Sequence, residues 1–171
     1  MQAQLDEAAG ESRGVLAELL DAYLRELAGH REIAVGACDA ATYPYLDAYF
    51  TEPGRYAFLI RRGGEIVGFA MVRTPDSTGG SASQVAEFYI KPESRGLGIG
   101  REAITLIWQR FPGAWELQVH ARNAAALRFW EFCIHSVLQR APEMREIDAA
   151  DGRRFQFDFH IADRRLTRQW S

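Results

Sequence analysis

A glycine-rich stretch is the clearest place for chemistry in this chain. Residues 95–100 read Arg-Gly-Leu-Gly-Ile-Gly, after a strand-like run that ends at Ile90 and before a helical pattern. Glycines have no β-carbon, so a ligand can approach the backbone N–H groups, and a helix N-terminus adds positive potential there. The stretch therefore predicts a phosphate-binding turn, in which Arg95 or Arg101 adds a charge contact.

Two familiar phosphate-binding motifs fit this stretch poorly. The loop of nucleoside triphosphatases ends in Gly-Lys-Ser/Thr, whereas Gly100 is followed by arginine and glutamate. The dinucleotide fingerprint fits Gly98, Gly100 and Ala103 only by forcing, and it expects an acidic residue at the end of the next strand. Glu116 has roughly the right distance but begins that strand. A dinucleotide-dependent oxidoreductase therefore stays open as a weaker alternative.

Apolar periodicity and glycine or proline breaks predict the elements around the turn. Strands are expected at 2–5, 55–62, 65–74, 84–90, 114–120, 136–146 and 153–161, helices at 12–27, 41–50, 103–111 and 123–132, and a loop at 75–83. The helix between strands 84–90 and 114–120 makes these two strands parallel, whereas hairpin connections make their partners antiparallel. We expect an α/β fold with a mixed sheet and helices on both faces.

Composition bounds the class of protein. The 171 residues, 47% of them apolar, predict one domain over 1–171 with its own core. A net charge of −3 and the lack of a long basic run argue against nucleic acid, and no apolar run is long enough for a membrane span. Two distant cysteines, Cys38 and Cys133, indicate reduced thiols rather than a disulfide framework or a zinc cluster. We expect a cytoplasmic protein without a metal, and the acidic N-terminus has no signal-peptide pattern.

A third pattern fits residues 95–100 without forcing. They match R/Q-x-x-G-x-G/A, after a strand and the turn Lys91-Pro92-Glu93. Residues 123–131, Asn-Ala-Ala-Ala-Leu-Arg-Phe-Trp-Glu, are similar to a family segment N-x-x-A-hydrophobic-R-hydrophobic-Y-E, and residues 65–70 are similar to the third strand of the same family. In this order the segments resemble the GNAT superfamily of N-acetyltransferases, from Ser12 onward.

The resemblance implies a mostly antiparallel sheet with one splayed parallel pair, and transfer of an acetyl group from acetyl-coenzyme A directly to an amine. The acceptor would be a small molecule or a peptide, and the protein a monomer or a homodimer. The loop amides would hold the pyrophosphate, strand 88–90 would pair with the pantetheine arm, and an N–H near Ile90 would polarise the thioester. The implied coenzyme-binding residues are Phe88, Tyr89, Ile90, Arg95, Gly96, Leu97, Gly98, Ile99, Gly100, Arg101, Asn123 and Trp130.

The sequence departs from the family at the proton-transfer positions. Trp130 stands where a tyrosine acid is expected, and Gln118 stands where some relatives carry a glutamate. A non-catalytic coenzyme A-binding or regulatory module therefore stays open as an alternative.

Among the candidate general bases, Glu87 comes first, because a carboxylate in an apolar strand needs a partner or a water-filled pocket. An ion pair with an arginine is an equal alternative, and a bulge leaves the face of Glu87 open.

His120, near a strand end, is the second candidate base, although a solvated histidine is the more common state there. The aromatic cluster Tyr43, Tyr45, Tyr49 and Phe50 either packs in the core or lines the acceptor pocket.

Overall fold

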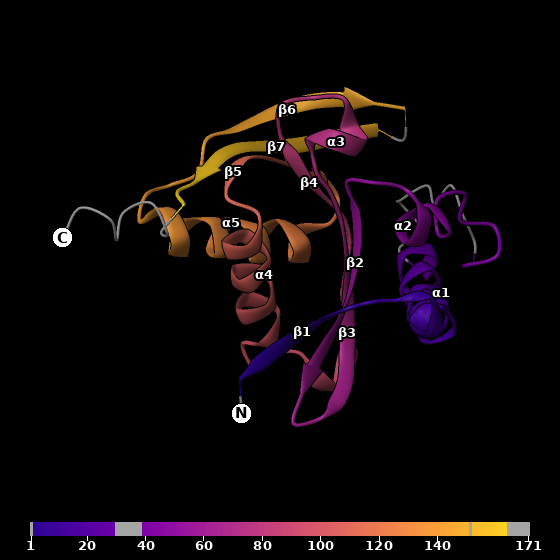
Figure 1. Cartoon of the computed structure of the whole chain (residues 1–171). Helices are drawn as coiled ribbons and strands as arrows, with labels where there is room; N and C mark the ends of the chain where they lie inside the picture. Colours follow the sequence, from indigo (N-terminus) through magenta and orange to yellow (C-terminus); the bar gives the residue numbers. More distant parts are fainter. Residues whose placement is uncertain (1, 30–38, 151, 164–171) are drawn as a thin grey trace.

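The structure is a computed structural model, and it describes residues 2–29, 39–150 and 152–163. The described part of the chain contains seven strands together with α-helices and two short 3-10 helices (Figure 1). In chain order the elements are β1 (Ala3–Glu7), η1 (Gly10–Ser12), α1 (Arg13–Gly29), α2 (Ala48–Thr51), β2 (Arg55–Arg62), β3 (Glu65–Arg73), α3 (Pro75–Thr78), β4 (Ser83–Ile90), η2 (Pro92–Ser94), α4 (Ile99–Arg110), β5 (Gly113–His120), α5 (Ala124–Leu138), β6 (Met144–Ala149) and β7 (Gly152–Ile161).

The strands form one mixed sheet in the order β1-β2-β3-β4-β5-β7-β6. Every neighbouring pair is antiparallel except β4 and β5. That parallel pair is joined only at Ser83↔Trp115 and Gln84↔Glu116, so the two strands separate after their first residues. The predicted mixed sheet with a splayed parallel pair is therefore confirmed.

Helices cover both faces of the sheet. Figure 1 shows α4 and α5 on one side of the sheet and α1 and α2 on the other. Phe58 and Ile60 of β2 pack in the core beneath α4 and α5, whereas Ala57 and Leu59 pack in the core beneath α1 and α2. Central strands with helices on both faces bury both sets of side chains, which explains the continuous apolar runs in β2 and β3.

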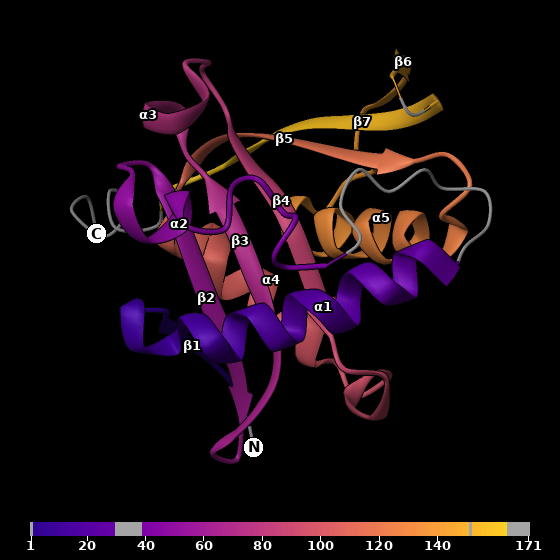
Figure 2. The same ribbon diagram turned by 90° about the vertical axis from the view of Figure 1, so that its right-hand side faces the viewer.

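The cover on the α1 side ends before the far strands of the sheet. In β5, Trp115, Leu117 and Val119 are buried beneath α4 and α5, whereas the residues between them are partly or fully exposed. Figure 2 looks onto this face, where α1 crosses β2, β3 and β4, whereas β5 and β7 lie above α1 and are not crossed by it. The open face of β5 and β7 therefore adjoins the gap between β4 and β5.

Several predicted boundaries were wrong. The helix expected at 41–50 begins only at Ala48 and ends at Thr51, because turns occupy the residues before it. Asp39 stabilises the first of these turns by accepting the N–H and the hydroxyl of Thr42, both at 2.8 Å. The expected strand 136–146 begins only at Met144, since α5 continues to Leu138. The expected loop 75–83 contains the short helix α3.

Within residues 2–29, 39–150 and 152–163, no helix is long and apolar enough to cross a membrane. The same part of the chain contains no group of three or more side chains that could hold a metal ion.

Candidate active site

The gap between β4 and β5 exposes the edge of β4. Lys91 donates its N–H to Val67 O of β3 at 2.9 Å. Backbone groups of successive strand residues point to opposite sides, so the N–H and C=O of Ile90 point toward the gap. Arg95 Nε donates to Ile90 O at 2.8 Å from that side, which agrees with this direction. An exposed strand edge of this kind can pair with an extended ligand.

Side chains on both faces hold this part of β4 in place. Phe88 stacks on Phe129 of α5 with 5.6 Å between ring centroids and meets Trp130 at 5.4 Å. Tyr89 is buried on the opposite face, where its ring lies 5.9 Å from that of Tyr23 in α1. The exposed edge therefore belongs to a strand that is packed against α5 on one face and against α1 on the other.

The glycine turn leads from β4 into α4. Gly96 and Gly98 have φ values of +74° and +80°, a left-handed conformation that other residues adopt at a cost. A β-carbon built on either residue meets nothing within 4 Å, so both face open space. The first helical hydrogen bond of α4 runs from Glu102 N–H to Gly98 O. The N–H groups of residues 99–101 precede it and therefore have no acceptor within the helix. This arrangement fits a pyrophosphate group.

The third glycine has a different structural reason. Gly100 lies in the first turn of α4, where a β-carbon would come within 3.1 Å of the Phe129 ring. Gly100 therefore lets α4 approach α5, and this packing requirement corrects the assumption that all three glycines serve phosphate approach. Leu97, between the first two glycines, is exposed at 57%, and Ile99, the first residue of α4, is buried in the core.

Of the two arginines at the turn, Arg95 is held by neighbouring groups. Besides its bond to Ile90 O, it donates to Glu26 Oε2 of α1 at 2.7 Å and lies over the Tyr89 ring. The hydrogen bond to Glu26 raises the pKa of Arg95. Arg101 in the first turn of α4 lies 5.8 Å from the ring of the exposed Phe132. Arg95 thus braces the turn against α1, and Arg101 stays near its outer surface.

Glu87 reaches the α1 side of the sheet through a bulge. Met71 of β3 pairs with Glu87 and Val72 pairs with Val85, so Ala86 is an extra residue in β4. An extra residue shifts the side-chain alternation and re-aims the residues next to it. Met71 packs in the α1-side core, and its partner Glu87 therefore lies on that face too.

Two tyrosines hold Glu87. Tyr43 donates its hydroxyl to Glu87 Oε1 at 3.0 Å, and Tyr23 of α1 is hydrogen-bonded to the same carboxylate. Burial raises the pKa of Glu87, while the two phenols and the charge of Arg154 in β7 lower it. Burial also raises the pKa values of Tyr23 and Tyr43, with a further increase from the charge of Glu87. Among the described residues, the hydrogen bonds given to this carboxylate thus come from neutral phenols, and Arg154 acts on it through its charge.

His120 ends β5 on the other side of the gap. Its Nδ1 accepts the N–H of Arg122 at 3.2 Å, and the residue pairs with Arg154 of β7. Glu87 lies three residues beyond the last β4–β5 pair, and His120 lies four residues beyond it. The structure therefore places the two candidate bases on opposite sides of the gap, Glu87 on β4 and His120 on β5. Arg154 is the strand partner of His120 and also acts on Glu87 through its charge.

Asn123 and Trp130 have structural tasks in α5. Asn123 caps the helix, because its side-chain oxygen accepts the N–H of Ala126 at 3.1 Å. Trp130 is only 8% exposed, and its ring lies 4.9 Å from that of Phe129 in the core. An indole enclosed in this way packs behind the gap and offers no acidic proton.

A polar row on the open face extends from the site. Gln118 donates to Glu116 Oε1 at 3.2 Å and to Gln156 Oε1 at 3.1 Å, and Gln84 of β4 donates to the same Glu116 oxygen. Sequence reasoning missed this row, as well as Tyr23 and Arg154. The alternating pattern of residues 153–161 was a usable signal, since it places every second residue outside the core.

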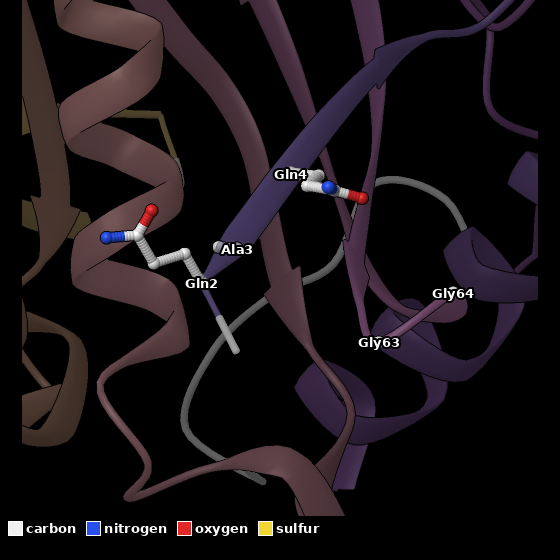
Figure 3. Close-up of a pocket in the computed structure, with 5 residues that line it drawn as sticks. All are labelled: Gln2, Ala3, Gln4, Gly63 and Gly64. Carbon is white, nitrogen blue, oxygen red and sulfur yellow. The ribbon is translucent and has the colours of Figure 1, made fainter.

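The surface has two further hollows, one at β1 and one along α1. Figure 3 shows one of about 350 Å³ between the start of β1 and the turn at Gly63 and Gly64. The other, of about 600 Å³, lies along α1 and reaches Tyr89 and Lys91. Neither hollow includes Glu87 or the glycine turn in its lining.

Comparison with known proteins agrees with this geometry. Residues 16–133 match the model of the acetyltransferase (GNAT) family. An acetyltransferase from Thermus thermophilus is 17% identical and has a TM-score of 0.65, with 94% of this chain and 98% of that chain covered. A Bacillus anthracis protein in complex with acetyl coenzyme A is 14% identical, with a TM-score of 0.64 and coverage of 95% and 100%.

A third similar structure is a mutant form of the spermidine N-acetyltransferase from Vibrio cholerae. It is 15% identical, has a TM-score of 0.64, and the match covers 98% of each chain. Among curated proteins, none matches the sequence. At these identities the similar structures establish the fold, and the family match rests on residues 16–133.

Proposed function

Because the chain belongs to the acetyltransferase (GNAT) family, a family of acyltransferases, we propose that it transfers an acetyl group from acetyl-coenzyme A directly to an amine. The observation that carries the proposal is the continuous path from the open edge of β4 into the glycine turn, with Glu87 beside it. A spermidine N-acetyltransferase among the similar structures supports an amine as the acceptor.

The backbone binds the coenzyme in this proposal. The N–H groups of residues 96–101 hold the pyrophosphate, aided by the N-terminus of α4. Phe88–Ile90 pair with the pantetheine arm as an added strand would, and the N–H of Ile90 stabilises negative charge on the thioester oxygen. Arg95 holds the glycine turn against the edge of β4 through its hydrogen bond to Ile90 O. Asn123 caps the N-terminus of α5 beside them.

Glu87 is the base in this proposal. It accepts the proton from the amine as nitrogen attacks the thioester carbon, and the carbon–sulfur bond then breaks with the electron pair on sulfur. Tyr23 and Tyr43 keep the carboxylate oriented toward the gap. Trp130 gives no proton, so solvent protonates the thiolate, and positioning supplies much of the rate. His120 is the second candidate for the base.

Calorimetry with acetyl-coenzyme A, free coenzyme A and NAD tests the binding step. We expect binding of both coenzyme A forms and none of NAD, whereas binding of NAD alone would replace the proposal with the oxidoreductase alternative. An acetyl-turnover assay over an amine panel then tests catalysis. Coenzyme binding without transfer to any amine would favour the non-catalytic module. A cytoplasmic location and a monomeric or homodimeric state stay predictions.

A further inference from the structure

Two arginines face each other in the sheet beside the candidate active site. Arg55 begins β2 and Arg73 ends β3, and the two are direct partners in the antiparallel register. Direct partners point to the same face, and like charges in this position destabilise a sheet. Ala57 and Met71, two residues further along each strand, pack in the α1-side core. The arginine pair therefore lies on the same face as Glu87.

Arg55 is largely satisfied where it lies. Its Nε donates to Glu52 at 2.8 Å, and its side chain is only 12% exposed. The guanidinium also lies 5.2 Å and 5.5 Å from the ring centroids of Tyr45 and Tyr49. The carboxylate of Glu52 and the two aromatic rings thus stabilise the positive charge of Arg55.

Arg73 has no comparable contacts among the described residues. Its Nε is buried without a hydrogen-bond partner, and none of the ion pairs found among residues 2–29, 39–150 and 152–163 includes it. The neighbour on its other side is the neutral Gln84, and the next carboxylate along the row, Glu116, is bound to Gln84 and Gln118. A buried donor without a partner destabilises the folded state, and an anion beside Arg73 would satisfy this donor.

The arginine pair is close to the proposed reaction centre. Arg73 lies two residues beyond Met71, the partner of Glu87, which corresponds to about 7 Å along the strand. The pKa of Tyr49 is raised to about 12, and burial is the largest cause. The charges of Arg55, Glu87 and Arg73 also act on Tyr49, so this tyrosine lies near all three groups. The carboxylate and the arginines therefore lie within the length of a single small molecule.

We propose that the acceptor is an amine that also carries a carboxylate or similar anion, with its amine at Glu87 and its anion at Arg73. The inference rests on the proposed acetyl transfer and specifies its substrate class. Arg73 donates charge-assisted hydrogen bonds to the anion, and Arg55 adds positive potential from the opposite strand. The separation along the strand favours a chain of several bonds between the two groups over a compact α-amino acid.

The test compares acceptors that differ only at the end far from the amine. The series runs from glycine to 8-aminooctanoate, and each member is paired with the alkylamine in which a methyl group replaces the carboxylate. A diamine, 1,6-diaminohexane, gives the opposite charge at that end. We expect the best amino carboxylate to exceed its alkylamine at least tenfold in kcat/KM and to exceed the diamine by more.

The matched variants are Arg73→Gln and Arg62→Gln. Arg62 lies at the other end of the same hairpin, paired with Glu65, and serves as the control. We expect Arg73→Gln to abolish the preference for the carboxylate while acetylation of alkylamines stays within about twofold. Arg62→Gln should retain the preference. Equal losses for all acceptors in Arg73→Gln, or a wild-type preference for the alkylamine or the diamine, would overturn the inference.

A binding measurement separates this inference from the proposed function. Calorimetry titrates 6-aminohexanoate and hexylamine into protein saturated with coenzyme A. Tighter binding of the carboxylate that is lost in Arg73→Gln supports the anion site even if no acetyl group moves, whereas equal binding rejects it. Failure of coenzyme A itself to bind instead rejects the proposed function, and the same titration without coenzyme then decides on the anion site.

Discussion

Glu87 combines three features expected of a base: a position beside the strand edge, a raised pKa and two phenols that fix its orientation. Desolvation destabilises the carboxylate, which makes it a better proton acceptor near neutral pH. The phenols and Arg154 limit this effect and keep the group ionisable. The balance between burial and these partners therefore determines how basic the site is.

Glu87→Gln keeps the shape of the side chain but removes the proton acceptor. We expect turnover to fall about a hundredfold or more and the acidic limb of the pH–rate profile to disappear, with coenzyme affinity unchanged. The raised pKa means that ionised Glu87 lowers the stability of the folded protein above the pKa of the unfolded chain. The melting temperature of the variant should therefore hold or rise at neutral pH.

The control for this change is Glu65→Gln, at the exposed start of β3. Wild-type turnover and pH profile in a stable Glu87→Gln protein would remove Glu87 from the mechanism and direct attention to His120.

Tyr43→Phe removes one hydrogen bond from Glu87 and leaves the ring in place. The lost donor had stabilised the carboxylate, so the pKa of Glu87 should rise further and the acidic limb of kcat/KM should move to higher pH. The plateau rate should change only a few-fold, since the base itself remains. Tyr45→Phe is the matched control, because Tyr45 is 53% exposed. An unshifted limb in Tyr43→Phe would show that this bond does not tune the base.

At the scale of elements, the site forms where one strand leaves its neighbour. β4 pairs with β3 along its length, but it pairs with β5 only at its first residues. The bulge at Ala86 turns Glu87 to the α1 side, and the glycine turn joins the strand to α4. The edge, the bulge and the turn lie within one short stretch of chain, so a shift in any of them moves the others.

Gly98 and Gly100 should respond differently to substitution. Gly98→Ala forces a β-carbon into a left-handed conformation, at roughly 1–2 kcal/mol, and places it in the open space proposed for the pyrophosphate. We expect at least a tenfold loss of coenzyme affinity in a folded protein. Gly100→Val should instead push on Phe129 and lower the melting temperature first.

Circular dichroism and calorimetry on both variants check this contrast. Wild-type coenzyme affinity in Gly98→Ala would reject the role of the turn, and an unchanged melting temperature in Gly100→Val would reject the packing role of Gly100.

At the scale of the whole molecule, the coenzyme should link the two sides of the gap. The proposed contacts come from β4, the turn, α4 and the start of α5, and helices fix these elements in one core. A ligand that binds only the folded state stabilises it by mass action. Stability with and without ligand is therefore a test of the complete site.

Acetyl-coenzyme A at a hundredfold excess over its dissociation constant should stabilise the protein by about 2.7 kcal/mol. For a chain of this size the melting temperature should rise by roughly 5–10 °C. Differential scanning fluorimetry with acetyl-coenzyme A, and with NAD as the control, measures this shift. The absence of a shift at millimolar acetyl-coenzyme A would contradict every reading that includes coenzyme binding.

Apart from the short helix α3, the sequence by itself determined the order of strands and α-helices, the mixed sheet with its parallel pair and the glycine turn. These features depend on local patterns: alternating apolar residues in the strands, helical spacing in α1, α4 and α5, and glycines where the backbone adopts positive φ. Boundaries such as the start of β6 were missed, because capping and packing rather than periodicity decide where an element ends.

Only the tertiary structure decided which side chains meet. The face of Glu87 depends on a bulge, and its two phenols come from segments 44 and 64 residues earlier in the chain. The opposition of Arg55 and Arg73 follows from the hairpin register, and the need for Gly100 follows from the approach of Phe129. Register and helix packing are set by the burial of whole faces, so no local pattern could have revealed these contacts.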